Sequence, residues 1–236
     1  SESFESEDES KFKSELPERY DVIRWIGKGG FGEAFLCKDK ELNRDVVMKR
    51  PYSRNFDEIL YEAEIQAKFQ NPNIVSIYDI NRSNSSTFIF MEFCSHGSLR
   101  NRIQTKGKLR DDEIKVLVKC VANGLKSIHK ENITHKDLGP HNIFIDSNGS
   151  AKIGDFGIAE TKGLKGAGYH PLYRAPDIQQ YDNTSYDLYT LGQTIITCWK
   201  GLPTEPYNQD DIPEKSTVDI LLWLVAKLLL SEKPEK

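Results

Sequence analysis

Short apolar stretches separated by Gly, Asn and charged residues follow one another from residue 20 onward, a pattern typical of consecutive strands. Within the first ninety residues this pattern predicts strands at 20–29, 32–40, 44–50, 73–80 and 87–93. Between the third and fourth of these, residues 55–70 open with Asn55 as a cap and repeat apolar residues at helical spacing. We therefore expect a small sheet with one helix.

The pattern changes after Gly97, where the helical period dominates. Residues 109–130 combine an acidic first turn, which a helix N-terminus favours, with a long apolar stripe. Two short apolar stretches, 142–146 and 151–156, flank an Asn-Gly pair and predict a hairpin. Buried helices are expected at 184–201 and 217–230. The whole pattern predicts an α+β protein with a sheet-rich part, a linker near 92–97 and a larger helical part.

These changes in pattern divide the chain into three parts. Residues 1–18 are rich in Ser and acidic residues and too poor in apolar residues to offset the entropy of ordering, so we expect a flexible tail. Residues 19–93 and 94–236 are expected to form two lobes. Because the chain starts at Ser rather than Met and stops abruptly, we expect it to be an excised piece of a longer protein.

Composition narrows the classes of function. The 236 residues carry a net charge of -4, which gives no basic field for nucleic acid. The four cysteines lie far apart without a C-x-x-C pair, so reduced thiols in a cytoplasmic protein are expected. No signal peptide is visible, and the apolar run at 218–230 is shorter than the ~20 residues that span a membrane. We expect no membrane segment in this chain.

A glycine-rich stretch and a lysine suggest phosphate binding in the first lobe. The glycines of GKGGFG at 27–32 would let backbone N–H groups approach a phosphate. The same sequence is also typical of a glycine-rich hairpin turn that binds no phosphate. A strand follows it, whereas a dinucleotide-binding fold needs a helix. VVMK places Lys49 in an apolar strand, and Glu62 on the next helix can reach it if that helix packs on the sheet.

A second group of polar residues lies in the expected second lobe. HKDLGPHN at 135–142 supplies Asp137 and Asn142 on a turn, and DFG places Asp155 at a strand end. Two oxygen ligands on neighbouring strand ends suit Mg²⁺. Asp137 is then left to orient an attacking hydroxyl and accept its proton.

Taken together, these motifs resemble the eukaryotic-like protein kinases of the Ser/Thr type from Tyr20 to the C-terminus. The matched stretches are GKGGFG, VVMK, HKDLGPHN, DFG, APD and DLYTLG. The resemblance implies a bilobal protein-kinase-like fold, truncated before the last helix, that transfers the ATP γ-phosphoryl group to Ser/Thr hydroxyls of proteins. It also implies Mg²⁺ as cofactor, with Mn²⁺ as an alternative.

The resemblance assigns roles to individual residues. Asp137 is implied as the catalytic base, Lys49 paired with Glu62 as the phosphate holder, and Asn142 with Asp155 as metal ligands. Asp187 is implied to brace the loop of Asp137. The residues implied to contact the nucleotide are Gly27, Lys28, Gly29, Gly30, Phe31, Gly32, Ala34, Val47, Lys49, Met91, Glu92, Cys94 and Phe144.

Three positions depart from the family pattern. Gly139 stands where Ser/Thr members carry a lysine that neutralises the transferring phosphoryl group, and His170 replaces a threonine expected at the same site. A restored lysine at 139 is expected to raise activity. Gln66 replaces an apolar residue behind the helix. His96 and His141 are expected to face solvent without a role.

Two other classes of function remain open. The departures are compatible with an ATP-binding pseudokinase, or weakly active kinase, that serves as an allosteric or scaffolding partner. A kinase for small molecules shares the same chemistry, although APD and GLPTEPY favour a protein substrate. Regulatory domains or proteins are expected outside this fragment.

Overall fold

The computed structural model describes residues 14–29, 32–52, 55–83, 86–156, 160–161, 172–173 and 183–230. Contacts within the chain separate them into two compact units. The first unit holds the residues up to Lys68 together with Ser76–Phe93, and the second holds Phe69–Val75 and the residues from Cys94 onward.

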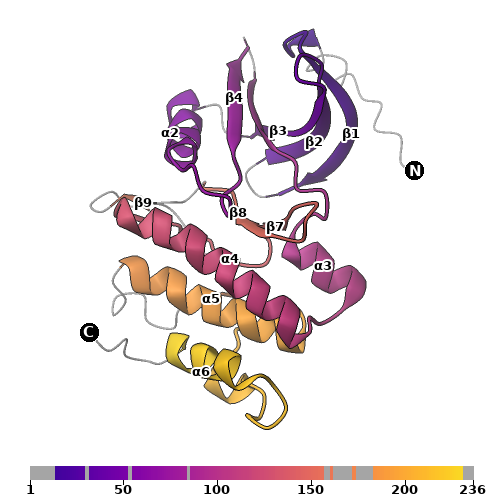
Figure 1. The fold of residues 1–236 in the computed structure, drawn as a ribbon. Coiled ribbons are helices and arrows are strands. Elements are labelled where there is room, and N and C mark those ends of the chain that lie inside the picture. The colour runs from indigo at the N-terminus through magenta and orange to yellow at the C-terminus, as the bar shows by residue number, and fades with distance from the viewer. Residues whose placement is uncertain are drawn as a thin grey trace. The chain divides into compact units, whose positions relative to one another are not determined.

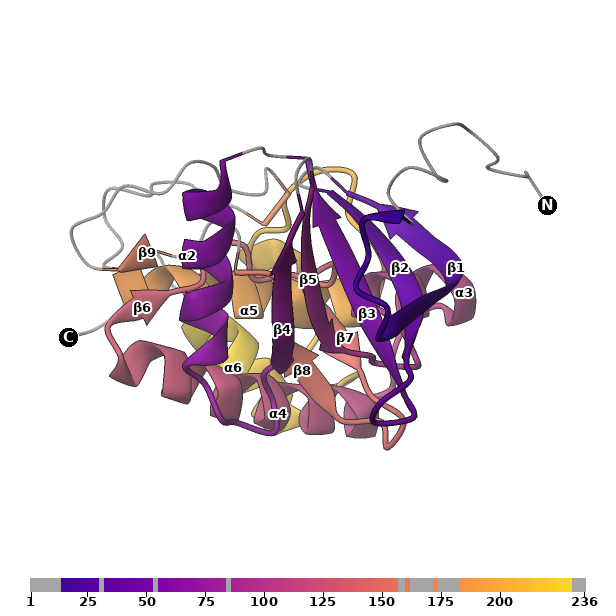
Figure 2. The same ribbon diagram turned by 90° about the horizontal axis from the view of Figure 1, so that it is seen from above.

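The first unit is an antiparallel five-stranded sheet with one helix. Its elements are β1 (Tyr20–Lys28), β2 (Gly32–Asp39), β3 (Arg44–Pro51), α2 (Phe56–Ala67), β4 (Ile77–Arg82) and β5 (Thr87–Glu92). The strands lie in the order β1-β2-β3-β5-β4. Figure 2 shows them side by side, with α2 next to the β4 edge. The expected helix and four of the expected strands are confirmed, and the fifth, at 73–80, is confirmed only from Ile77 onward.

Strand alternation gives this sheet two different faces. One face carries a cluster of fully buried side chains, including Met48 and Phe90, against which the Tyr20 ring stacks at 3.6 Å between ring centroids. The other face carries Ile89, which packs with Ile59 and Ala63 of α2. Because side chains alternate along a strand, burying one set forces the other set onto the α2 face.

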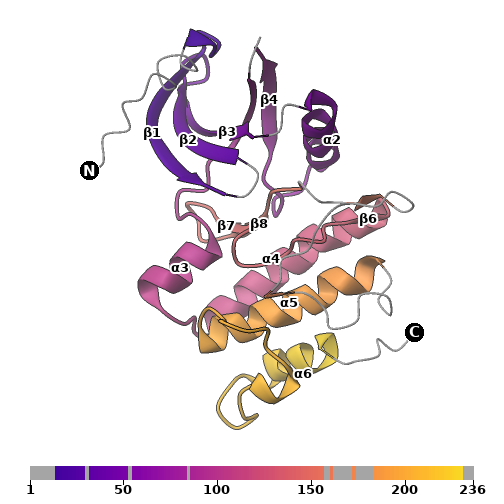
Figure 3. The ribbon, with the colours of Figure 1, turned by 180° about the vertical axis from the view of Figure 1, so that it is seen from behind.

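The second unit is mainly helical, as expected. Its elements are α3 (Leu99–Lys106), α4 (Asp111–Lys130), β6 (Ile133–Thr134), β7 (Ile143–Ile145), β8 (Ala151–Ile153), β9 (Glu160–Thr161), α5 (Asn183–Lys200), the 3₁₀ turn η2 (Gln209–Asp211) and α6 (Ile220–Leu229). Figures 1 and 3 show α4, α5 and α6 stacked in that order. The predicted hairpin is confirmed, because β7 pairs with β8 and Gly149 turns between them at φ +80°.

Asp111 at the start of α4 joins three helices. Its Oδ1 accepts a hydrogen bond from Nε1 of Trp199 in α5 at 2.8 Å. Its Oδ2 accepts one from the backbone N–H of Asp219, just before α6. The acidic first turn therefore also connects neighbouring helices. In the part of the chain that is described, no helix has both the length and the apolar character to cross a membrane.

The expected strand at 73–80 is wrong in its first half. Ile74 and Val75 are buried in the second unit, where Val75 donates to the carbonyl of Ile153 at 2.8 Å and Ile153 donates to that of Asn73 at 2.8 Å. β4 begins only at Ile77. The apolar residues at 73–80 are thus shared between the two units. Hydrophobic periodicity alone does not predict where such a stretch is divided.

Candidate active site

Lys49 and Glu62 form an ion pair in the first unit. The Lys49 ammonium lies 2.8 Å from Oε1 of Glu62, and their side chains are only 12% and 17% exposed. Lys49 follows the fully buried Met48 on β3, so alternation turns it to the α2 face. Asn55 caps α2 by accepting from the N–H of Asp57, and Ile59 and Ala63 seat the helix on the sheet. Because α2 is fixed against the sheet by these contacts, Glu62 is held within reach of Lys49 on β3.

The apolar residues expected to contact the nucleotide share this face. Ala34 pairs with Lys49 across β2 and β3, and Val47 pairs with Met91 across β3 and β5. All four side chains are partly exposed, whereas the opposite face carries the buried cluster that includes Met48 and Phe90. The sheet therefore presents a half-open apolar surface with one ammonium on it.

The glycine-rich stretch bends between β1 and β2. Gly27 and Lys28 pair with the strand opposite, and the N–H of Gly29 donates to the carbonyl of Gly32 at 2.9 Å. A Cβ at Gly32 would lie 2.5 Å from the carbonyl oxygen of Arg50, so only glycine fits there. Gly30 and Phe31 lie outside the described residues.

Glu92 and Cys94 fall on either side of the boundary between the units. Glu92 closes a small loop in the first unit, where its N–H donates to the Ser76 carbonyl at 2.9 Å and its carboxylate accepts from the Ser76 N–H at 3.2 Å. Cys94 is buried in the second unit and accepts from the N–H of Gly97 at 3.0 Å.

A buried carboxylate holds the loop of Asp137 in the second unit. Asp187 of α5 is fully buried and accepts from the backbone N–H groups of His135 and Lys136, each at 2.9 Å. Its Oδ2 also lies 2.9 Å from Nε2 of His129 on α4. Lys136 has a φ of +66°, a strained conformation for a residue with a side chain. Asp187 fixes that strained turn.

Asp137, Asn142 and Asp155 are brought together by a short network. Nδ2 of Asn142 donates to the carboxylate of Asp137 at 2.8 Å and to its carbonyl at 2.9 Å. The N–H of Gly154, next to Asp155, donates to the carbonyl of Asn142 at 3.0 Å. Asp155 itself has a φ of +61°.

The donor set of this network fits a hard divalent cation. With its amide nitrogen directed to Asp137, Asn142 offers its amide oxygen, and Asp155 offers a carboxylate. Phe144 lies beside them, because a Cβ at Gly154 would come within 3.0 Å of its ring. An oriented carboxylate beside two oxygen ligands can accept a proton from a hydroxyl.

Packing below the loop is dense and aromatic. The His135 ring meets Phe156 edge-on at 4.9 Å between centroids, and Phe69 stacks on Phe156 at 5.8 Å between centroids. His135 is fully buried, and its Nε2 lies 3.2 Å from the Gly154 carbonyl. Burial lowers the pKa of the Lys136 ammonium, and the nearby Asp187 opposes that shift.

The expectation that His141 faces solvent is wrong. Its side chain is only 20% exposed, and its Nε2 lies 3.3 Å from Oδ1 of Asp137. Sequence reasoning missed this contact because one histidine in a loop carries no periodic signal; its spacing of four from Asp137 was the available hint. His96 is exposed, as expected.

Comparison with known proteins agrees with this geometry. The family model described as protein kinase domain matches residues 20–234. CBL-interacting serine/threonine-protein kinase 24 of Arabidopsis thaliana is 28% identical over 209 residues, 83% of this chain and 46% of that protein. Serine/threonine-protein kinase Nek5 of Homo sapiens is 36% identical over 194 residues, 74% of this chain and 27% of that protein. The chain spans less than half the length of these relatives.

Proposed function

Since the chain belongs to the protein kinase domain family, we propose that it transfers the γ-phosphoryl group of ATP to Ser or Thr hydroxyls of protein substrates. The observation that carries the proposal is the fixed carboxylate of Asp137, held by Asn142 at 2.8 Å next to the oxygen of that same carboxamide. Members of this family use ATP and a divalent cation, and both kinds of ligand fit the residues present.

Each residue has a distinct task in this mechanism. Lys49, kept in place by Glu62, binds phosphate oxygens of ATP. Asp137 orients the acceptor hydroxyl and takes its proton as the oxygen attacks the γ-phosphorus. Asn142 and Asp155 would hold Mg²⁺, with Mn²⁺ as a substitute; when bound, the cation neutralises phosphate charge.

The remaining sequence-derived residues would bind the nucleotide. Ala34, Val47 and Phe144 would contact the adenine, and Met91 would lie behind it. Backbone groups of Glu92 and Cys94 would form hydrogen bonds to it. The glycine-rich stretch, Gly30 and Phe31 included, would cover the phosphates. The half-open apolar face around Lys49 supports this assignment.

Substrate and context are inferred from the relatives and the sequence. Ser/Thr specificity rests on relatives described as serine/threonine-protein kinases and on the absence of the tyrosine-kinase loop motifs L-A-A-R-N and L-R-A-A-N. The domain boundary near 93, a cytoplasmic location and regulation by domains or proteins outside this chain belong to the same proposal. Of the tail expected at 1–18, residues 1–13 lie outside the described residues, and Leu16 packs against the buried cluster of the sheet.

The test is transfer of labelled γ-phosphate to a generic basic protein. The wild-type chain should exceed the Asp137→Asn variant by about 100-fold or more, because the general base alone contributes that much. Asn is close in size to Asp and can still accept from Asn142, so loss of fold is not expected. Equal rates in the two proteins would contradict the proposal.

Gly139 favours one alternative, an ATP-binding pseudokinase that acts as an allosteric or scaffolding partner. Position 139 offers no side chain to the phosphoryl group. In that case the chain would bind ATP, with wild type and Asp137→Asn equally inactive. A binding measurement with an ATP analogue, run beside the transfer assay, separates the two functions.

A further inference from the structure

The space beside Gly139 is filled by another residue of the same loop. A Cβ built at Gly139 would lie 2.8 Å from Cε1 and 3.0 Å from Nδ1 of His141, and 3.4 Å from Cδ2 of Tyr173. Real Cβ contacts are essentially never below 3.0 Å. Any side chain at position 139 therefore requires the imidazole of His141 to move.

The ring atom bonded to Cε1, Nε2, faces Asp137. Nε2 of His141 lies 3.3 Å from Oδ1 of Asp137, an ion-pair distance without hydrogen-bond geometry, and both side chains are largely shielded from solvent, at 20% and 14% exposure. One edge of the imidazole, Nδ1–Cε1–Nε2, thus meets both the space beside Gly139 and the carboxylate of Asp137. The other carboxylate oxygen, Oδ2, accepts from Asn142 at 2.8 Å. Consecutive residues, 141 and 142, contact the two oxygens separately.

Tyr173 limits where the imidazole can go. It is buried, and its ring centroid lies 6.0 Å from that of His141. Gly139 on one side and Tyr173 on another leave the ring against Asp137. A glycine at 139 and a histidine at 141 are therefore complementary: the missing side chain makes room for the ring.

We propose that His141 is a positioning residue for Asp137, occupying the space that a side chain at position 139 would fill and holding the carboxylate in the orientation in which it accepts a proton. This inference rests on the proposed kinase function. The inference gives a role to the glycine in HKDLGPHN, the most unusual feature of the loop. Because Gly139 has no side chain, the ring of His141 can occupy the space beside it.

A pair of variants separates positioning from simple packing. His141→Leu keeps the bulk of the side chain but removes the polar nitrogen, and His141→Gln can return a nitrogen at a similar reach. Leucine should lower kcat for a generic basic protein by about 10-fold or more, with KM for ATP within about 2-fold. Glutamine should recover most of the loss. His96→Leu, an exposed histidine outside the loop, is the control and should leave both constants unchanged.

Equal losses for leucine and glutamine would overturn the positioning role, as would a leucine variant with wild-type kcat. In the Asp137→Asn background the leucine change should add nothing further, because residues that act as a unit are not additive. Should the wild type itself transfer no more than Asp137→Asn, the kinase function fails, and the catalytic part of this inference fails with it.

Thermal unfolding tests the shared space without any activity. Gly139→Lys should lower Tm by about 2–4 °C when His141 is present and by clearly less in a His141→Ala background. In the activity assay Gly139→Lys alone should bring no gain, contrary to the sequence-based expectation, whereas the double variant should exceed His141→Ala. Additive Tm shifts would show that the ring does not occupy this space.

Discussion

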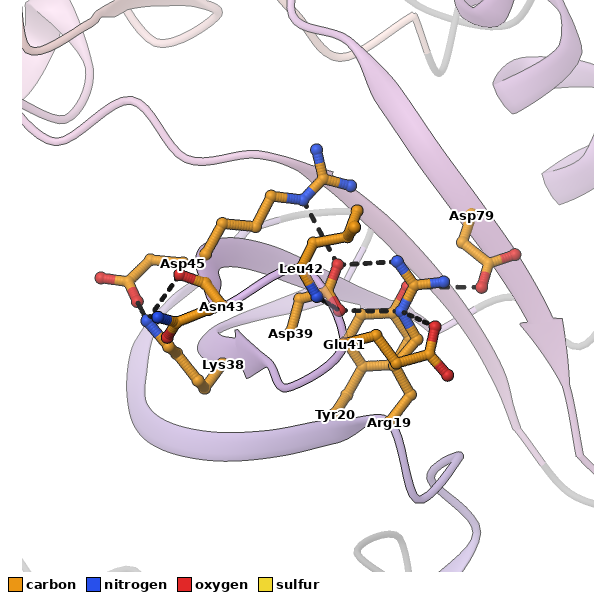
Figure 4. A network of polar contacts seen from close by, with 10 residues as sticks. Arg19, Tyr20, Lys38, Asp39, Glu41, Leu42, Asn43, Asp45 and Asp79 are labelled. Carbon is orange, nitrogen blue, oxygen red and sulfur yellow. Dashed lines mark hydrogen bonds and ion pairs between the residues drawn. The ribbon is translucent and has the colours of Figure 1, made fainter.

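At the scale of single residues, Asp39 is a fully buried acidic residue of the first unit. Its side chain is fully buried at the end of β2, and Arg19 donates to its two oxygens at 2.8 and 2.7 Å (Figure 4). Arg44 and the N–H of Leu42 add contacts at 3.3 Å. Hydrogen bonding from Arg19 holds the pKa of Asp39 far below its usual value of 3.8.

Asp39→Asn should therefore destabilise the chain at neutral pH by about 2 kcal/mol, the scale of hydrogen bonds to a charged group. Because the folded-state pKa lies below the unfolded one, the contribution of Asp39 is complete above about pH 5 and is lost as the pH falls towards the folded pKa. Denaturant unfolding across the range pH 2–8 should show the two proteins converging below about pH 4.

Asp45→Asn is the matched control. Asp45 lies 3.3 Å from Lys38 (Figure 4), but both side chains are well exposed, so removing its charge should change stability by less than about 1 kcal/mol. If the two variants lost equal stability, burial of Asp39 would not be the cause.

Residue-scale prediction from sequence succeeded where a motif also sets the geometry. The pairing of Lys49 with Glu62 follows from a strand and a helix that the apolar pattern places correctly, and the structure brings the two side chains to 2.8 Å. The contact of His141 with Asp137 depends on the φ angle of Lys136 and on the space left by Gly139. Neither leaves a trace in the periodicity of the sequence.

At the scale of elements, α4 approaches the segment before β4 closely. A Cβ at Gly124 would lie 2.9 Å from the carbonyl oxygen of Asn73 and 2.9 Å from Cδ1 of Ile153. Asn123 and Ser127 on the same helix accept or donate hydrogen bonds with Asn71 and Asn73. The helix is held against this backbone by both polar and apolar contacts.

Gly124→Ala should destabilise the chain by up to about 2 kcal/mol. Alanine gains about 1 kcal/mol over glycine in a helix interior, but overpacking against a backbone carbonyl costs about 1–3 kcal/mol and the backbone cannot rotate away. Denaturant unfolding measures the balance. Gly192→Ala is the comparison, because its Cβ would meet only Leu229 and Leu230 side chains at 3.0 Å, so its loss should be smaller. A more stable Gly124→Ala would contradict the contact.

Element boundaries show where sequence patterns stop being sufficient. Residues 73–80 read as one strand, yet Ile74 packs in the second unit and β4 starts at Ile77. The short pair β6 and β9 was not predicted, since two-residue strands are too brief for a period to appear. The long helices and the hairpin were predicted, because each carries an apolar stripe or a turn pair of its own.

At the scale of the whole molecule, the residues of the proposed function belong to two separate units. Lys49 and Glu62 belong to the first, while Asp137, Asn142 and Asp155 belong to the second. Each set is fixed by its own unit: the first by the sheet and α2, and the second by Asp187 and the loop network. The proposed function requires both sets to serve one nucleotide, a requirement that each unit alone cannot meet.

Thermal unfolding with nucleotide tests that requirement directly. A ligand that binds only the folded state stabilises it by about 2.7 kcal/mol at 100 times its Kd, so Mg²⁺ with a non-hydrolysable ATP analogue should raise Tm by about 5–10 °C. Lys49→Met in the first unit and Asp155→Asn in the second should each remove most of the shift, and EDTA should reduce it in the wild type. Asp45→Asn, which changes an ion pair with Lys38 outside the proposed site, again serves as the control and should keep the full Tm shift. If only one of the two site variants lost the shift, the nucleotide would be held by one unit, and the shared site would be refuted even if phosphoryl transfer were observed.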